Sequence, residues 1–230
     1  MTPDQMWAEP PAVGDPGSGS GVWRDLVAGA AAFAPNCTNE LSRRVVLLSH
    51  CLLNQNTRYL GGAVCPGAVQ RVIEPYIDAG TGLIQLPCPE QQTWGGVEKR
   101  TLLWIIDHPR ASRVAASLSG PGAAYLRLRY RRIARKVARD VADYVDGGFE
   151  VESIVGVGGS PSCGVKTTLD LPDALRALGA RSRGPVDAEW IDRAVIRAAT
   201  VTGAGLFIEA LARELDRKGL TVQLREVSLI

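Results

Sequence analysis

Short apolar runs alternate with helical stretches along most of the chain after residue 44. Near-continuous apolar runs at 45–49, 83–86 and 153–157 predict strands that are covered on both faces. A further run at 222–227 alternates apolar and polar positions and predicts a final strand. Because strands and helices alternate, we expect an α/β fold with a Rossmann-like, mostly parallel sheet flanked by helices.

Apolar residues at helical spacing fill the intervals between these strands. They predict a helix over 69–77, in which Pro75 is a kink or an early end, and a long helix over 125–145 that Gly147-Gly148 stops. The run at 102–106 fits either a strand or a helix turn, whereas the polar, glycine-containing stretches 52–62 and 87–96 predict loops.

Two further helices are expected before the last strand. Asp187 is predicted to cap a helix that runs to about residue 200. Gly203-Ala-Gly205 then leads into a helix with Phe207, Leu211 and Leu215 inward, which Gly219 ends. At the other end, residues 1–20 are rich in Pro, Gly and Ser and predict a disordered tail. Residues 21–43 form an extension in which 22–33 could be a short helix, so we place the single domain at 44–230.

Composition narrows the class of protein. Of 230 residues, 46% are hydrophobic, which is enough for a substantial core, yet no apolar run approaches the roughly 18 residues that a membrane span needs. A net charge of +2 is too small by itself to imply a nucleic-acid partner. Five cysteines without a secretory signal segment indicate reduced thiols in the cytoplasm.

Three of these cysteines follow three apolar strands. The run Ile154-Val-Gly-Val-Gly-Gly-Ser-Pro-Ser-Cys163-Gly164 opens from a strand into small residues that let the backbone approach a ligand. Cys51 and Cys88 follow the runs at 45–49 and 83–86 in the same way. One such cysteine is often a buried hydrophobe, but three in matching contexts are expected to converge at the carboxyl ends of the strands, where ligands bind.

Three thiolates suit two kinds of metal site. One is a tetrahedral zinc with an open fourth position, and the other is an iron–sulfur cubane with one iron free of protein. His50 is expected on the opposite strand face as a packed core residue, and His108 lies in a loop without a ligand pattern. Sulfur without a histidine partner favours iron–sulfur. Cys37 and Cys65 are expected to be plain thiols, although Cys65 could supply a fourth ligand.

Three ordered blocks carry a resemblance to a known family. Cys51-Leu-Leu-Asn-Gln-Asn-Thr-Arg-Tyr-Leu-Gly-Gly62, Cys88-Pro-Glu90 with Gly95-Gly96, and Ser160-Pro-Ser-Cys-Gly164 resemble the signatures of the TudS family, the thiouracil desulfidases. The similarity covers roughly 44–227. The first block departs from the usual pattern at Asn54, Thr57 and Leu60, in a loop that is expected to line the pocket.

The resemblance implies a cofactor and a reaction. Cys51, Cys88 and Cys163 would hold a [4Fe-4S] cluster, and Glu90 and Ser160 would be catalytic. The enzyme would hydrolytically remove sulfur from a thiolated heterocycle, a thiouracil or related thionucleobase, and release sulfide. Glu90 would activate water, and Ser160 would pass a proton to or from a ring nitrogen. Iron–sulfur assembly machinery would be a partner.

Two alternatives remain open at this point. A cluster or zinc ion ligated by four cysteines, with Cys65 as the fourth, would serve structure, sensing or electron transfer instead. A basic face on the helix over 125–145 could bind thiolated tRNA, although a solvated surface is the preferred interpretation. Its members are Arg127, Arg131, Arg132, Arg135, Lys136 and Arg139.

Overall fold

Four parallel strands form the central sheet, in the order β2–β1–β3–β6. They are β1 (Arg44–Leu48), β2 (Gly82–Gln85), β3 (Glu150–Val157) and β6 (Leu224–Val227). The computed structural model describes residues 40–58, 62–180 and 188–229, and Ser42–Ile230 form one compact unit. The parallel sheet confirms the predicted Rossmann-like α/β fold, and each predicted strand coincides with an observed one to within a few residues.

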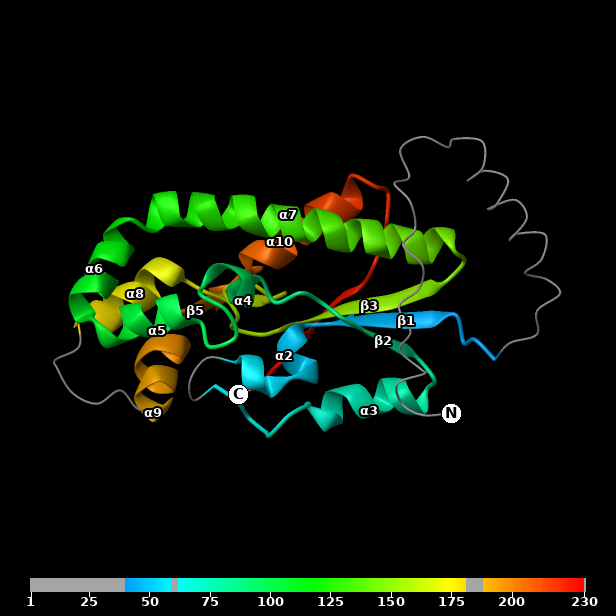
Figure 1. Ribbon diagram of the computed structural model, residues 1–230, viewed down its shortest axis with the longest axis horizontal. Coiled ribbons are helices and arrows are strands. Elements are labelled where there is room, and N and C mark those ends of the chain that lie inside the picture. Colours follow the sequence, from blue (N-terminus) through cyan, green and yellow to red (C-terminus); the bar gives the residue numbers. More distant parts are fainter. Residues whose placement is uncertain (1–39, 59–61, 181–187, 230) are drawn as a thin grey trace, which may run out of the picture. The chain divides into compact units, whose positions relative to one another are not determined.

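Helices cover both faces of this sheet (Figure 1). Leu47 and Ile154 pack on one side against α7 (Ser119–Asp146) and α10 (Leu206–Asp216). Val46 and Val155 pack on the other side against α2 (His50–Leu53) and the region of α3 (Gln70–Asp78). Successive strand residues point to opposite faces, so an uninterrupted apolar run supplies both layers of the core.

A smaller layer of elements extends beyond the carboxyl ends of the strands. The antiparallel strands β4 (Thr167–Leu169) and β5 (Thr200–Thr202) form a two-stranded sheet. Around it lie α5 (Arg100–Asp107), α6 (Pro109–Ser117), α8 (Leu171–Ala180), α9 (Ala188–Trp190) and the π-helix η5 (Ile191–Arg197). Ala174, Leu178, Val195 and Ala199 form the separate core of this layer.

Two stretches predicted as loops contain short helices. Residues 52–62 include the end of α2 and the 3-10 helix η4 (Gln55–Thr57), whose first turn is capped by the Asn54 side chain. Residues 87–96 include α4 (Pro89–Thr93), which begins with a proline at its first position and with Cys88 as its N-cap. Proline is favoured there because the first helical N–H groups have no partner within the helix.

The remaining helices differ from expectation mainly at their ends. The ambiguous run at 102–106 is helical and belongs to α5, and α7 begins several residues before the predicted start. Pro75 lies inside α3, which continues to Asp78. Gly148 follows α7 with a left-handed φ of 75°, as the glycine pair predicts. Within the described part of the chain, no helix is long and apolar enough to cross a membrane.

Some predictions lie outside the described residues. These are the disordered tail over 1–20, the short helix within 22–33 and the capping role of Asp187. The predicted helix that follows Asp187 is observed from Ala188, but it changes into a π-helix over Ile191–Arg197.

Candidate functional site

A cavity of about 390 Å³ lies where β1, β2 and β3 end. Cys51 reaches its wall from the first turn of α2, Cys88 from the N-cap of α4, and Cys163 from the loop after β3. Because β2, β1 and β3 are adjacent and parallel, the three segments that follow them leave the same edge of the sheet. The sheet therefore brings the three predicted cysteines to one cavity.

Cys163 is buried, and Cys51 and Cys88 are half-buried. Burial raises the pKa of Cys51, although the nearby Arg58 opposes this effect. Burial and then the Glu90 carboxylate raise the pKa of Cys88 to about 11. Cys163 is only 8% exposed, and burial followed by its interaction with Cys51 raises its pKa as well. A metal that binds here must therefore displace protons from neutral thiols.

The sulfur atoms of the cavity cysteines are suitable ligands for zinc or for an iron–sulfur cluster. Cys51, Cys65, Cys88 and Cys163 are free cysteines, and three of them line the cavity. Among the described residues, no three His, Cys, Asp or Glu side chains are grouped closely enough to hold a metal ion. A cubane spaces its thiolates more widely than one ion does, so sulfur donors in a buried cavity remain compatible with it. Convergence of the three thiols on a cluster stays a prediction.

His50 lines the cavity, whereas Cys65 packs elsewhere. His50 lines the same cavity as Cys51, because β1 ends at Leu48 and both residues belong to α2. The expectation that His50 packs on the opposite face of a strand is therefore wrong. Burial, and then the charge of Lys99, lower the pKa of His50 below its usual value. Cys65 packs beside the core on the α3 side of the sheet, and its thiol donates to the carbonyl of Ala68 over 3.4 Å.

The loop that carries Cys163 is held by close backbone contacts. The Val157 N–H donates to the carbonyl of Cys163 over 3.0 Å, so the loop folds back onto the end of β3. A Cβ atom at Gly156 would lie 2.1 Å from that carbonyl oxygen. At the same time, the carbonyls of Pro161 and Ser162 accept N–H groups from the first turn of α10. The small residues therefore fix the loop between a strand and a helix.

A second anchor of this loop comes from β6. The Glu226 carboxylate accepts hydrogen bonds from the backbone N–H groups of Val165, Lys166 and Thr167, over 2.8, 2.6 and 3.0 Å. It also accepts a hydrogen bond from the Thr167 hydroxyl over 2.9 Å. Burial alone would raise the pKa of Glu226, but these hydrogen bonds stabilise the charged form and lower it.

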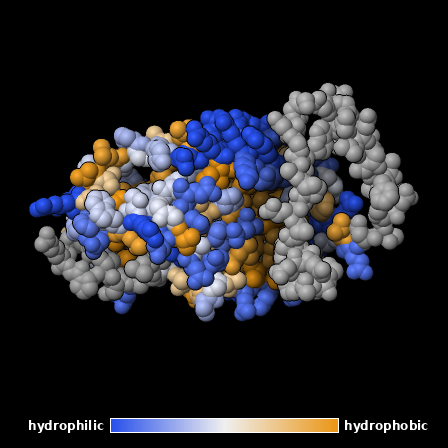
Figure 2. All heavy atoms as spheres, viewed as in Figure 1, coloured by the Kyte–Doolittle hydropathy of each residue, from blue (hydrophilic) through white to orange (hydrophobic). Residues whose placement is uncertain are grey.

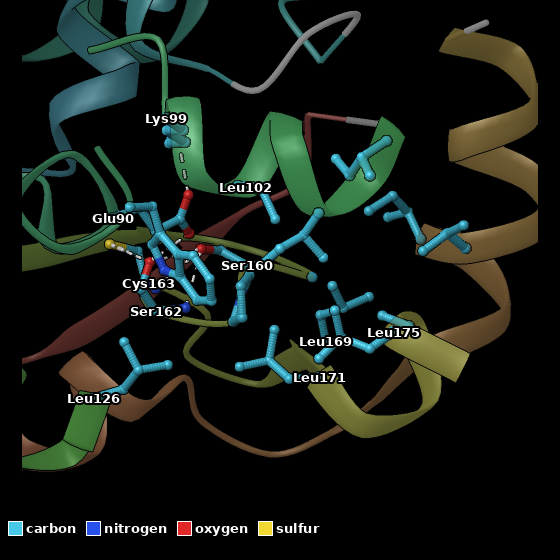
Figure 3. A pocket seen from close by; sticks show the side chains of 18 of the residues that line it. Glu90, Lys99, Leu102, Leu126, Ser160, Ser162, Cys163, Leu169, Leu171 and Leu175 are labelled. Carbon is cyan, nitrogen blue, oxygen red and sulfur yellow. Dashed lines mark hydrogen bonds and ion pairs between the residues drawn. The ribbon is translucent and has the colours of Figure 1, made fainter. Parts of the chain in front are cut away.

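Glu90 belongs to a polar group beside Cys163 (Figure 3). The Ser162 hydroxyl donates to Oε1 of Glu90 over 2.8 Å, and Ser160 Oγ lies 3.2 Å from Ser162 Oγ. Ser160 Oγ also accepts the backbone N–H of Cys163 over 3.0 Å. Ser160 thus caps the turn and lines the cavity as well, whereas Ser162 is the serine that contacts Glu90.

Lys99 is a site residue that the sequence did not suggest. It is only 2% exposed, and its ammonium lies 3.7 Å from Oε2 of Glu90 and donates to the carbonyl of Thr57. Its backbone is left-handed, with a φ of 51°. The run Glu98-Lys99-Arg100 resembles a solvated charged loop, so no local signal marks the middle residue as buried.

The far end of the cavity is apolar. Figure 3 shows Leu169, Leu171 and Leu175 grouped on the side away from Glu90, Lys99 and Cys163, with Leu102 between the two groups. These leucines come from α5, β4 and α8, and Ile191 and Val195 of the π-helix complete the wall. Sequence reasoning missed this end, because it predicts none of α6, β4 and α8 and because the run at 102–106 fits either a strand or a helix turn.

Part of the basic face of α7 forms ion pairs with α10. Strongly hydrophilic residues gather over α7 in Figure 2. Of these, Arg131 and Arg135 lie 3.2 and 3.4 Å from the carboxylate of Glu214, which is 6% exposed on α10. Arg217 contacts the same carboxylate. Two of the six basic side chains thus neutralise a buried charge.

Comparison with known proteins gives little further guidance. An uncharacterized protein of Methanocaldococcus jannaschii is 42% identical over 48 residues, which is 21% of this chain and 31% of that protein's length. The chain therefore matches less than a third of that relative. No family model matches the sequence, and no solved structure matches it.

Proposed function

We propose that this protein is a [4Fe-4S]-dependent desulfidase. It would remove sulfur hydrolytically from a thiolated heterocycle, a thiouracil or related thionucleobase, and release sulfide. The observation that carries the proposal is the shared cavity, which Glu90 lines together with Cys51, Cys88 and Cys163 and in which Ser162 and Lys99 hold Glu90. The three sequence blocks that resemble the TudS family contribute Cys51, Cys88, Cys163, Glu90 and Ser160 to this cavity.

Cys51, Cys88 and Cys163 would hold the cluster, which leaves one iron without a protein ligand. When bound, such a group supplies a Lewis acid for the sulfur of a thiocarbonyl. The cavity residues supply the remaining chemistry. Charge–charge interactions are stronger away from bulk water, so the nearly buried Lys99 and its partner Glu90 interact more strongly than an exposed pair would.

Glu90 is the general base in this proposal. Its carboxylate takes a proton from water, and the resulting hydroxide adds to the carbon that carries sulfur. The Ser162 hydroxyl donates a hydrogen bond to Oε1, and the Lys99 ammonium lies beside Oε2. Both contacts fix the orientation of the carboxylate. Ser160 passes a proton to or from the ring nitrogen. In balance, one thiocarbonyl and one water give one carbonyl and one hydrogen sulfide.

The alternative role of a fully ligated metal centre requires Cys65. That thiol instead donates to the Ala68 carbonyl, and Cys65 packs beside the core on the α3 side. This placement favours the three-cysteine set. A reducing compartment such as the cytoplasm, together with iron–sulfur assembly machinery, would supply free thiols and the cluster.

Sulfide release tests the proposal directly. The protein is reconstituted with iron and sulfide without oxygen and then incubated with thiouracil. We expect equal amounts of sulfide and uracil, and a much lower rate from the cluster-loaded Glu90→Gln variant. A fully loaded protein that releases no sulfide from thiouracil or other thionucleobases would contradict the proposal.

A further inference from the structure

The cavity is divided into two chemically different ends. Within the described part of the chain, the charged side chains that line it are Arg58, Glu90 and Lys99. All three belong to the cysteine end, since Arg58 interacts with Cys51 and Lys99 pairs with Glu90. The other end is lined by aliphatic side chains of α5, α6, α8 and η5.

We infer that the substrate is a thiolated heterocycle bearing an apolar substituent, which occupies the leucine-lined end of the cavity. This inference rests on the proposed function and adds the class of substrate to it. The thiocarbonyl and ring nitrogen would lie beside Glu90 and Ser160. An alkyl or aryl group would extend past Leu102 toward Leu169 and Leu175, which Figure 3 shows on the far side of the cavity.

Size and polarity both support a substituted substrate. The cavity volume of about 390 Å³ lies within the range of roughly 300–1,000 Å³ that is typical of sites for drug-sized ligands. An unsubstituted base engages the polar end and leaves the leucines without a partner. Apolar surface removed from water strengthens binding in proportion to its area, so an apolar substituent gains affinity here.

The same walls disfavour a phosphorylated substrate. A phosphate at the leucine-lined end would lose its hydration without a basic side chain to replace it, which is strongly unfavourable. At the cysteine end, Lys99 is already engaged by Glu90 and Thr57, and Arg58 donates to the Gly62 carbonyl and interacts with Cys51. The cavity therefore suits a neutral small molecule better than a nucleotide or an RNA.

The apolar end also borders the surface. Leu118, at the junction of α6 and α7, lines the cavity and is 57% exposed. Ala123, one helical turn further along, lines it too, whereas the adjacent Ala124 is exposed and lies outside the wall. This pair provides a matched test, because both substitutions to leucine change helix propensity equally.

The experiment measures binding separately from turnover. Uracil, propyluracil and uridine monophosphate are titrated calorimetrically into the cluster-loaded protein, since none of them contains sulfur to be released. We expect propyluracil to bind about tenfold or more tightly than uracil, the size of a methylene effect in an apolar pocket. Ala123→Leu should abolish this preference and Ala124→Leu should keep it.

Several results would overturn the inference. They are equal or undetectable binding of uracil and propyluracil to the parent protein, tighter binding of uridine monophosphate, and a preference for propyluracil that survives in Ala123→Leu with unchanged thermal stability. Propylthiouracil separates the two proposals. If propyluracil binds preferentially but propylthiouracil yields no sulfide, the apolar site stands and the desulfidase function fails.

Discussion

The hydroxyl of Ser162 donates to Oε1 of Glu90 over 2.8 Å and joins the loop after β3 to helix α4. The segment that follows β2 and the segment that follows β3 are thereby fixed to one another at the cysteine end of the cavity. The contact gives Ser162 a positioning role for Glu90, while Ser160 remains one hydroxyl further away.

Substitutions in this polar group should separate chemistry from cofactor retention. We expect Glu90→Gln and Ser160→Ala to keep the cluster and to release sulfide about 10²- to 10⁴-fold more slowly, as is usual for positioned acid–base groups. Ser162→Ala should lower kcat with little change in KM, because it acts through Glu90. Iron content and steady-state kinetics measure both effects. Parent rates in all three variants would assign these residues to structure alone.

Metal content should depend on three cysteines. After anaerobic reconstitution we expect ~4 iron and ~4 sulfide per protomer, as a cubane requires. Cys51→Ala, Cys88→Ala and Cys163→Ala should each lose the cluster. Cys65→Ser is the control and should retain it, because its thiol bonds to the Ala68 carbonyl. Loss of iron in Cys65→Ser would support a four-cysteine centre, and stoichiometric zinc without iron would contradict the cluster.

The buried pair of Lys99 and Glu90 should affect stability as well. Glu90→Gln leaves the Lys99 ammonium buried without its counter-charge, and we expect it to lower the free energy of unfolding by about 3 kcal/mol. A second change, Lys99→Met, should restore much of this loss. The control is Glu98→Gln, which removes the partner of Arg100 in an exposed pair and should leave the free energy of unfolding nearly unchanged, because water screens such a pair. Urea unfolding of the four proteins checks the set, and equal losses in Glu90→Gln and Glu98→Gln would be inconsistent with a buried charge.

Gly156 should tolerate no side chain. A Cβ atom there would meet the Cys163 carbonyl oxygen at 2.1 Å, and backbone cannot yield without displacing the loop. We expect Gly156→Ala to lower stability by several kcal/mol or to lose the cluster. Gly120→Ala is the control, since nothing lies within 4 Å of a Cβ at that helical position. It should change stability little, because Gly120 is the second residue of α7 and precedes Pro121, so the gain of a mid-helix alanine does not apply. Thermal unfolding and iron analysis of both variants distinguish the two cases.

The anchor between Glu226 and the loop after Cys163 should depend on pH. The pKa of Glu226 is lowered in the folded protein, so its contribution is present above the unfolded pKa, near 4.5, and is lost as the pH falls through the lower folded pKa. We expect Glu226→Gln to cost about 1.5–3 kcal/mol at neutral pH, the usual value of hydrogen bonds to a charged group.

The pH dependence itself provides the check. The difference between the parent protein and Glu226→Gln should shrink in urea titrations carried out progressively below pH 4.5. The exposed Glu150 supplies the control, and Glu150→Gln should match the parent throughout. A difference for Glu226→Gln that is constant down to strongly acidic pH would rule out the charged hydrogen bonds as its cause.

The sheet could be predicted because its strands are buried on both faces. Val45–Leu48 and the apolar end of β3 are therefore continuous apolar runs, which local sequence reveals directly. The placement of Cys51, Cys88 and Cys163 on one cavity followed from parallel strands. The short helices α2 and α4 were missed, although Pro89 directly after Cys88 is a usable signal for a helix start.

Other parts of the site have no local signature. Lys99 is buried by tertiary contacts with Glu90 and Thr57, and nothing in its neighbours distinguishes it from a solvated lysine. Strands β4 and β5 have three residues each, too few to show a period. The apolar end of the cavity depends on these strands and on α5, α6 and α8, so neither its extent nor its polarity could be anticipated.

The strand order β2–β1–β3 also determines when the cavity exists. The first two strands and their cysteines lie early in the sequence, while β3 and the loop with Ser160, Ser162 and Cys163 come after the whole of α7. Parallel pairing between such distant segments is slow, because loop closure must precede the contacts that reward it. A growing chain that has emerged only as far as α7 carries two of the three thiols and none of the serines. On the proposed function, cofactor loading therefore follows the pairing of β3 with β1, after the loop that carries Cys163 has been synthesised.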